Sequence, residues 1–224
     1  LVSKYGIKLI HNQEYLTRNN NSSIWAAKEV LGNSYICSSD NYFAVNPFET
    51  EVYDAYYAAE YTSEYTDEWC MTEDENGYIN SVTIGGSNAW YMLGHTFWSS
   101  EFSDQFLSIL EKEYHEPETR DKLWEKIFMA HLDVLKMRMK KYASGIIYEF
   151  DTMDELRKFD SSYVTDTHSV ILKKIAKDIG TTEDRIVRIS ALKGNGAEAI
   201  GFEFDDGQEH FRYLYKTEVL EKLD

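Results

Sequence analysis

The sequence has no long run of apolar residues. None of its segments approaches the ~18 consecutive apolar residues of a membrane-spanning helix, and no basic stretch followed by an apolar one has the pattern of a signal peptide. Only two cysteines are present, Cys37 and Cys70, and they form no disulfide or metal-ligand pattern. Such isolated cysteines are typical of buried thiols in a reducing compartment. We therefore expect a cytoplasmic protein without a membrane partner.

Basic residues are scarce. The 224 residues include 39 acidic and 23 basic side chains, which gives a formal charge of −16. A surface of that sign repels phosphate backbones and anionic lipids, so nucleic acid and membrane are poor candidate partners. A cationic ligand, or a metal that bridges a carboxylate and a phosphate, suits it better. Hydrophobic residues make up 43% of the chain and aromatic residues 15%, enough for a packed core.

Local patterns predict a mixed α/β domain followed by a small module. Residues 7–10, a helix over about 22–31 and residues 34–38 read as a strand–helix–strand unit, which favours a parallel sheet. Further strands are expected at 56–61, 69–73, 78–84, 90–98 and 146–150, with a hairpin turn at Asp74-Glu75-Asn76-Gly77. Further helices are expected from Ser99 or Ser100, over about 118–130, and from Asp154.

A domain boundary is predicted near Ser161-Ser162, which divides the chain into residues 1–162 and 163–224. After it, apolar residues at helical spacing from Val170 to Ile179 precede a break at Gly180. Three strands follow, at 186–192, 198–204 and 209–215. This pattern predicts a separate small α+β module.

Two aspartates follow predicted strands. Asp40 comes after 34–38 and Asp151 after 146–150. Ligands of open α/β sheets bind at the carboxyl ends of the strands, and Mg²⁺ takes one or two carboxylates and completes its shell with water and phosphate oxygens. The two aspartates are therefore candidate Mg²⁺ ligands. The competing interpretation is that each is a turn former or a helix cap.

Six short stretches occur in one order over about residues 7–159: Asn12-Gln13-Glu14-Tyr15, Arg18-Asn19-Asn20-Asn21-Ser22-Ser23-Ile24, Tyr35-Ile36-Cys37-Ser38-Ser39-Asp40-Asn41-Tyr42, Asp67-Glu68-Trp69, Gly94-His95-Thr96-Phe97-Trp98 and Ile147-Tyr148-Glu149-Phe150-Asp151. In their order and spacing they resemble bacterial choline-phosphate cytidylyltransferases of the sugar-nucleotidyltransferase superfamily. The pattern of that family is N-x-x-Y, a pair of Asn before a helix, and a strand that closes in D-x-D-N.

This resemblance implies a partial nucleotidyltransferase fold, Rossmann-like with a mixed sheet. It implies that a phosphate oxygen of phosphocholine attacks the α-phosphorus of CTP, with Asp40 and Asp151 as the first and second metal-binding aspartates and Mg²⁺ between the phosphates. Two departures stand out. Ser38 replaces the first Asp of D-x-D, and no Gly-rich G-x-G-T-R loop with its following Lys occurs in the 224 residues.

The second departure bears on activity. The sequence starts at Leu1 with a pattern typical of the middle of a domain, and the nearest Gly pair, Gly194-Asn195-Gly196, lies in the other module. We expect either a fragment that begins inside the domain and is inactive alone, or a protein that has lost nucleotide chemistry. The second alternative is a non-catalytic choline- or phosphocholine-binding or regulatory protein with this fold.

The acceptor side of the family is better represented. A quaternary ammonium is recognised by aromatic faces and nearby carboxylates, and each desolvated cation–π contact is worth ~1–2 kcal/mol. Three tryptophans are candidate walls of the pocket and two glutamates are candidate counter-charges: Trp69, Trp98, Trp124, Glu68 and Glu149. Any of these tryptophans can instead be a core residue, and His95 reads as a core histidine. Transfer to a sugar phosphate would favour hydroxyl-binding residues in their place.

The C-terminal module contains four segments in a characteristic order: Ile171-Leu172-Lys173-Lys174-Ile175-Ala176, Ala191-Leu192-Lys193-Gly194, Gly201-Phe202-Glu203-Phe204 and Phe211-Arg212-Tyr213. In this order they resemble the start of a choline or ethanolamine kinase amino-terminal lobe. The kinase pattern G-G-x-T-N is replaced by Gly194-Asn195-Gly196-Ala197-Glu198, which puts an acidic group where phosphates would lie. No catalytic lobe follows within the sequence, so we do not expect kinase activity from it.

Overall fold

The computed structural model describes residues 2–194 and 198–223, and it divides the chain into two compact units, Leu1–Glu149 and Phe150–Asp224. The division falls nearer the N-terminus than the predicted boundary at Ser161-Ser162. Arg157 explains why: it is buried, and its guanidinium donates to the carbonyls of Ile186 and Glu183, at 2.6 Å each. These bonds fix the helix that carries Arg157 within the second unit. Whether each unit folds alone stays a prediction.

The first unit is built on a six-stranded mixed sheet in which only β3 and β7 run parallel. The strand order is β5-β4-β6-β3-β7, and β1 pairs with the C-terminal end of β6. The predicted mixed α/β class is confirmed. The strands are β1 (Ser34–Ile36), β3 (Tyr56–Thr62), β4 (Thr66–Glu73), β5 (Ile79–Gly86), β6 (Ala89–Trp98) and β7 (Arg138–Tyr142).

Local chemistry accounts for several of these elements. The hairpin between β4 and β5 turns at Asp74–Gly77, as predicted, because Gly77 adopts a φ of 79° that side chains rarely allow. Helix α3 (Ser100–Glu113) begins at Ser99, whose hydroxyl accepts a hydrogen bond from the Phe102 amide at 3.2 Å. The predicted helix over 118–130 is broken into η2 (Pro117–Thr119) and α4 (Trp124–Ala130).

One expected unit does not form. Residues 7–10 form no strand, and Ile7, Leu9 and Ile10 are exposed. They follow the short helix α1 (Val2–Tyr5) and precede α2 (Asn21–Ala27) and η1 (Lys28–Val30). The predicted strand–helix–strand unit is therefore wrong, because β1 pairs antiparallel with β6 and the segment 7–10 pairs with no strand among the described residues.

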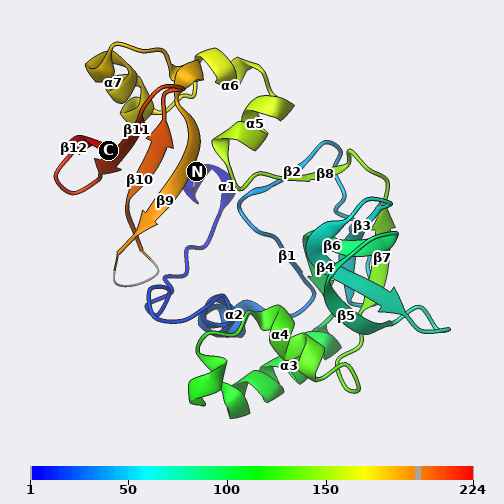
Figure 1. The fold of residues 1–224 in the computed structure, drawn as a ribbon. Helices are drawn as coiled ribbons and strands as arrows, with labels where there is room; N and C mark the ends of the chain where they lie inside the picture. Colours follow the sequence, from blue (N-terminus) through cyan, green and yellow to red (C-terminus); the bar gives the residue numbers. More distant parts are fainter. Residues whose placement is uncertain (1, 195–197, 224) are drawn as a thin grey trace. The chain divides into compact units, whose positions relative to one another are not determined.

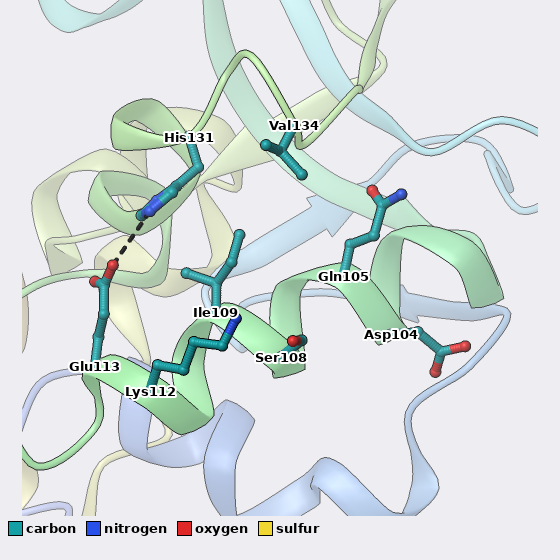
Figure 2. Close-up of a pocket in the computed structure, with 8 residues that line it drawn as sticks. All are labelled: Asp104, Gln105, Ser108, Ile109, Lys112, Glu113, His131 and Val134. Atoms are coloured by element: carbon teal, nitrogen blue, oxygen red, sulfur yellow. Dashed lines mark ion pairs between the residues drawn. The ribbon is translucent and has the colours of Figure 1, made fainter.

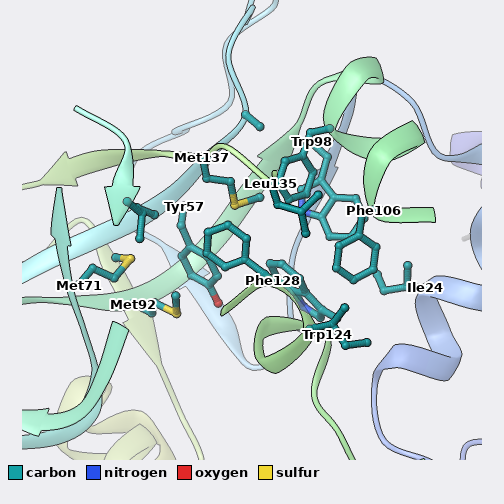
Figure 3. Close-up of a cluster of buried hydrophobic side chains, with 14 of the residues drawn as sticks. Ile24, Tyr57, Met71, Met92, Trp98, Phe106, Trp124, Phe128, Leu135 and Met137 are labelled. Atoms are coloured by element: carbon teal, nitrogen blue, oxygen red, sulfur yellow. The ribbon is translucent and has the colours of Figure 1, made fainter. Parts of the chain in front are cut away.

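Helices α2, α3 and α4 lie along one side of this sheet (Figure 1). Their apolar side chains and those of the sheet form a single core in which aromatic rings interleave with Leu135 and Met137 (Figure 3). Figure 3 labels its central members: Ile24, Tyr57, Met71, Met92, Trp98, Phe106, Trp124, Phe128, Leu135 and Met137. Burial of this much apolar surface is the main stabilising contribution to the unit.

A second, two-stranded element lies against β6. Strands β2 (Asn41–Phe43) and β8 (Ile147–Glu149) pair antiparallel, and we call them the β2–β8 ribbon. In this pairing Asn41 lies opposite Glu149, and Phe43 opposite Ile147. The ribbon therefore brings together two segments that are far apart in the sequence.

The second unit packs helices against a four-stranded antiparallel sheet of order β12-β11-β10-β9. Helix α7 was predicted, and Gly180 ends it with a φ of 74°. The fourth strand was not predicted. The segment Gly194–Glu198, quoted above for its likeness to a kinase motif, includes residues 195–197, which lie outside the described residues. The elements are α5 (Met153–Phe159), α6 (Ser162–Thr165), α7 (Val170–Ile179), η3 (Glu183–Arg185), β9 (Val187–Lys193), β10 (Ala199–Asp205), β11 (His210–Leu214) and β12 (Val219–Leu223).

Within residues 2–194 and 198–223, no helix combines the length and the apolar character that crossing a membrane requires. Cys70 is buried, as predicted, whereas Cys37 is exposed because it lies just past the end of β1.

Candidate functional site

Two pockets that share several residues open on the first unit beside the N-terminus of α4. Their volumes are about 270 Å³ and 160 Å³. The larger is lined by Asn20, Ser38, Asn41, Tyr57, Glu68, Trp69, Met92, Gly94, Leu123, Glu125 and Glu149. The smaller is lined by Asn20, Ser23, Ile24, Ile36, Cys37, Ser38, Tyr57, Gly94, Thr96, Trp124 and Glu125. The lining combines carboxylates with aromatic rings.

Strand β4 supplies two of the predicted residues. Glu68 and Trp69 are neighbours on it, with Glu68 exposed and Trp69 half-buried. Both line the larger pocket, together with Glu149 at the end of β8. The structure therefore brings these three predicted residues together.

Asn20 organises the entry to α4. Its side-chain oxygen accepts a hydrogen bond from the Trp124 amide at 2.7 Å, and its side-chain nitrogen donates to Glu125 Oε2 at 3.2 Å. Tyr57 also donates to the Glu125 carboxylate, and its ring stacks on Trp124 with 5.9 Å between centroids. These contacts hold the Glu125 carboxylate in the pocket wall.

Sequence reasoning missed Asn20, Tyr57 and Glu125 as site residues. Asn20 belongs to the Asn pair of the quoted motif, and Glu125 follows a predicted wall residue, so both could have been found. Nothing in the local pattern distinguishes Tyr57 from the other tyrosines of its strand.

The pocket is electrically negative. Burial is the main cause that raises the pKa of Glu125, and hydrogen bonds from Asn20 and Tyr57 act against it. The pKa of Tyr57 is raised by burial and then by the negative charges of Glu125, Glu149 and Glu68. A cation that entered the pocket would therefore be attracted by three carboxylates in a partly desolvated space.

Trp98 does not take part in this pocket, which corrects the prediction for that residue. It is fully buried and its ring packs 4.6 Å from Phe106 and 5.0 Å from Trp124, between centroids. Side chains alternate along β6, and that of Trp98 faces the helices, so its ring fills the core. Trp124 serves both purposes, since it is a core residue that also lines the smaller pocket.

The two predicted metal ligands lie next to the ribbon. Asp40 is exposed and directly precedes β2, whose first residue, Asn41, pairs with Glu149. Asp151 follows β8 by two residues and belongs to the second unit, where its amide donates to Glu155 Oε2 at 2.9 Å. Carboxylate oxygens are the ligand type that Mg²⁺ prefers. The assignment of Mg²⁺ to Asp40 and Asp151 stays a prediction.

A third pocket, of about 540 Å³, lies elsewhere on the first unit, along α3 (Figure 2). His131 and Glu113 approach each other at one end of it, with Nε2 and Oε1 3.2 Å apart. Ile109 and Val134 supply its apolar part, and it contains none of the residues predicted for the site.

Comparison with solved structures shows which fold class the chain belongs to. No family model matches the chain. The solved structure of the CTP:phosphocholine cytidylyltransferase from Streptococcus pneumoniae superposes with a TM-score of 0.67 and 25% identity, over 72% of this chain and 71% of that one. An inositol-1-phosphate CTP transferase from T. maritima, 13% identical over 72% and 67% of the two chains, shares the fold with a TM-score of 0.50. The chain has a nucleotidyltransferase fold.

Sequence relatives narrow this class. The chain is 26% identical to the choline-phosphate cytidylyltransferase of Streptococcus pneumoniae over 160 residues, 71% of this chain and 70% of that protein. It is 29% identical to a 2-aminoethylphosphonate cytidylyltransferase of Lancefieldella rimae over 161 residues, 70% and 65% of the two chains. It is 26% identical to the choline-phosphate cytidylyltransferase of Haemophilus influenzae over 157 residues, 69% and 67%. The chain is related to cytidylyltransferases, and the resemblance predicted from the motifs is confirmed.

Proposed function

We propose that the larger pocket binds phosphocholine, and that the chain is the acceptor- and metal-binding portion of a choline-phosphate cytidylyltransferase. The observation that carries the proposal is the lining of this pocket, which combines Trp69 with the acidic residues Glu68, Glu125 and Glu149. A quaternary ammonium cannot hydrogen-bond through its nitrogen, so an aromatic face and negative charge are what recognises it. The names of two relatives agree with this substrate.

The phosphate end of the ligand would lie toward the ribbon. Asp40 precedes it, Glu149 ends it, and Asp151 is two residues further along the chain, so its Cα lies within about 7 Å of that of Glu149. This donor set fits Mg²⁺, which keeps water and phosphate oxygens as its remaining ligands. When bound, the ion would neutralise charge on the phosphates of CTP and phosphocholine. The chain's own part is to hold the acceptor's head group and orient its phosphate.

A primary ammonium is the second candidate head group. The side-chain oxygen of Asn41 is buried and has no hydrogen-bond partner among the described residues, and Asn41 lines the larger pocket. An ammonium N–H could donate to this oxygen, whereas a trimethylammonium could not. One relative is named for 2-aminoethylphosphonate, which carries such a group. The competing class remains a non-catalytic protein that binds choline or phosphocholine.

Calorimetric titration of the full chain with phosphocholine tests the binding proposal. Trp69→Ala and Glu149→Gln should each weaken binding at least about fivefold, since a desolvated cation–π contact or charge is worth ~1–2 kcal/mol. Trp90→Ala is the matched control, because Trp90 is also a half-buried sheet tryptophan but lies outside the pocket. Equal affinities for all four proteins would contradict the site.

We expect these 224 residues alone to release no pyrophosphate from CTP, phosphocholine and Mg²⁺. The sequence contains no Gly-rich loop with a following Lys to hold the triphosphate, and loss of one preorganised donor typically costs ~3–4 kcal/mol of barrier. A coupled pyrophosphate assay measures this, with a complete choline-phosphate cytidylyltransferase as the positive control. Turnover by the 224 residues would show that they hold the nucleotide by other groups.

A further inference from the structure

The β2–β8 ribbon lies against β6 at Gly94. Gly94 has a φ of 94°, and a β-carbon there would lie 2.7 Å from Ile147 Cγ2 and 3.6 Å from the Phe43 ring. Both contacts come from the ribbon, one from each strand. A side chain at this position would push the ribbon away, so close packing of the ribbon requires glycine.

The next residue, His95, is fully buried. Its ring lies among aromatic rings 5.3–5.8 Å away between centroids, contributed by four strands and one loop: Tyr35, Phe43, Phe48, Tyr56 and Tyr142. Its Nε2 is 3.0 Å from the Tyr56 hydroxyl, while its Nδ1 has no hydrogen-bond partner in the described part of the chain. The predicted core histidine is thus confirmed as buried.

The same cluster fastens the segment that connects β1 to β3. The Tyr35 hydroxyl accepts a hydrogen bond from the Glu49 amide at 2.9 Å and donates to the Glu49 carbonyl at 3.1 Å. Lys140 forms an ion pair with the Glu49 carboxylate at 2.5 Å. Residues 35–49 include Ser38 and Asn41, which line the larger pocket, so the cluster lies behind part of its wall.

The role of His95 in this cluster does not depend on charge. Burial lowers the pKa of His95 to about 4, and the positive charge of Lys140 acts in the same direction. The other polar groups around it are the hydroxyls of Tyr35, Tyr56 and Tyr142. At neutral pH the imidazole is therefore uncharged, and it acts through packing and through the hydrogen bonds of its Nε2 with the Tyr56 and Tyr142 hydroxyls.

We propose that His95 is a positioning residue that holds the β2–β8 ribbon on β6, and thereby places Asn41 and Glu149 in the wall of the acceptor pocket. Phe43 of the ribbon packs against the His95 ring and is two residues from Asn41 in the sequence. On the other strand of the ribbon, Ile147 packs against Gly94 and is two residues from Glu149. A shift of the ribbon relative to β6 would therefore displace both Asn41 and Glu149 from the pocket wall. The part of this inference that calls the pocket an acceptor pocket rests on the proposed function.

Hydrogen exchange of the full chain, followed by mass spectrometry, tests the positioning directly. His95→Leu keeps much of the volume but removes the hydrogen bonds to Tyr56 and Tyr142. Phe43→Leu removes the ring contact with His95 from the ribbon side. In both variants, amides of 41–44 and 147–149 should exchange at least about tenfold faster than in the native chain. Amides of β3 and β4 should change less, because the sheet hydrogen bonds of these strands remain.

Phe106→Leu is the control for a merely structural effect, since Phe106 is fully buried in the core between the helices and the sheet, which does not include His95 or Phe43. Phe106→Leu should not speed amide exchange in the ribbon more than in the rest of the first unit. Unchanged exchange in the ribbon of both variants, or the same ribbon-specific increase in Phe106→Leu, would overturn the proposal. If either His95→Leu or Phe43→Leu fails to fold, the other still gives the comparison.

Phosphocholine titration of the same proteins separates this inference from the proposed function. If the native chain binds phosphocholine, His95→Leu should weaken binding at least about fivefold and Phe106→Leu should not. If the native chain does not bind phosphocholine but the ribbon loosens as expected, the proposed acceptor is wrong and the positioning role stands.

Discussion

Replacement of Trp98 by alanine is expected to lower the free energy of unfolding of the first unit by about 3–5 kcal/mol, the usual cost of removing a large aromatic side chain from a core. The ring is fully buried and touches Phe102, Phe106 and Trp124. Its removal would leave a cavity that these rigid rings cannot fill. Urea denaturation followed by circular dichroism measures the loss.

Trp69→Ala is the matched comparison. Trp69 is half-buried at the pocket, so its loss should cost only about 1 kcal/mol of stability. Phosphocholine binding should show the reverse order, with a clear loss for Trp69→Ala. A cost below about 1 kcal/mol for Trp98→Ala would show that its ring is not part of the core.

Arg157→Leu is expected to destabilise the second unit by about 2–5 kcal/mol. The guanidinium donates to the carbonyls of Ile186, Glu183 and Tyr163 and pairs with Asp154. Without the guanidinium all of these contacts are lost, and each buried acceptor left without a partner costs ~1–3 kcal/mol. Helix α5 would then detach from the turn between η3 and β9.

Limited proteolysis and urea denaturation of the full chain measure this effect. Cleavage within residues 153–167 should become faster in Arg157→Leu. Lys158→Leu is the control, because Lys158 is the next residue of the same helix but is exposed. If the two variants behave alike, Arg157 does not join α5 to the second unit.

Features set by neighbouring residues could be predicted from the sequence. The cap at Ser99 and the turn at Asp74–Gly77 each follow from the chemistry of a few adjacent side chains and from backbone freedom at glycine. Most strands of both units were found in the same way. The boundary between the units was not, because it depends on Arg157 and on carbonyls about 30 residues away in sequence.

The site was predicted in part for the same reason. The motif resemblance pointed to Glu68, Trp69 and Glu149, and the structure places all three in one pocket. It could not separate Trp69 from Trp98, because which face of a strand is covered by helices depends on tertiary packing. The strand prediction at 7–10 was wrong for a similar reason, because an apolar run forms a strand only where a partner strand pairs with it, and that depends on tertiary packing.

The most direct test of the acceptor pocket compares phosphocholine with dimethylbutyl phosphate, in which carbon replaces the quaternary nitrogen. The two have nearly the same shape and differ in the charge of the head group. If Trp69 and the three carboxylates recognise a cation, calorimetric titration of the full chain at neutral pH should show phosphocholine binding at least about tenfold more tightly, a difference of ~1.4 kcal/mol. Equal affinity for the two ligands would contradict the account.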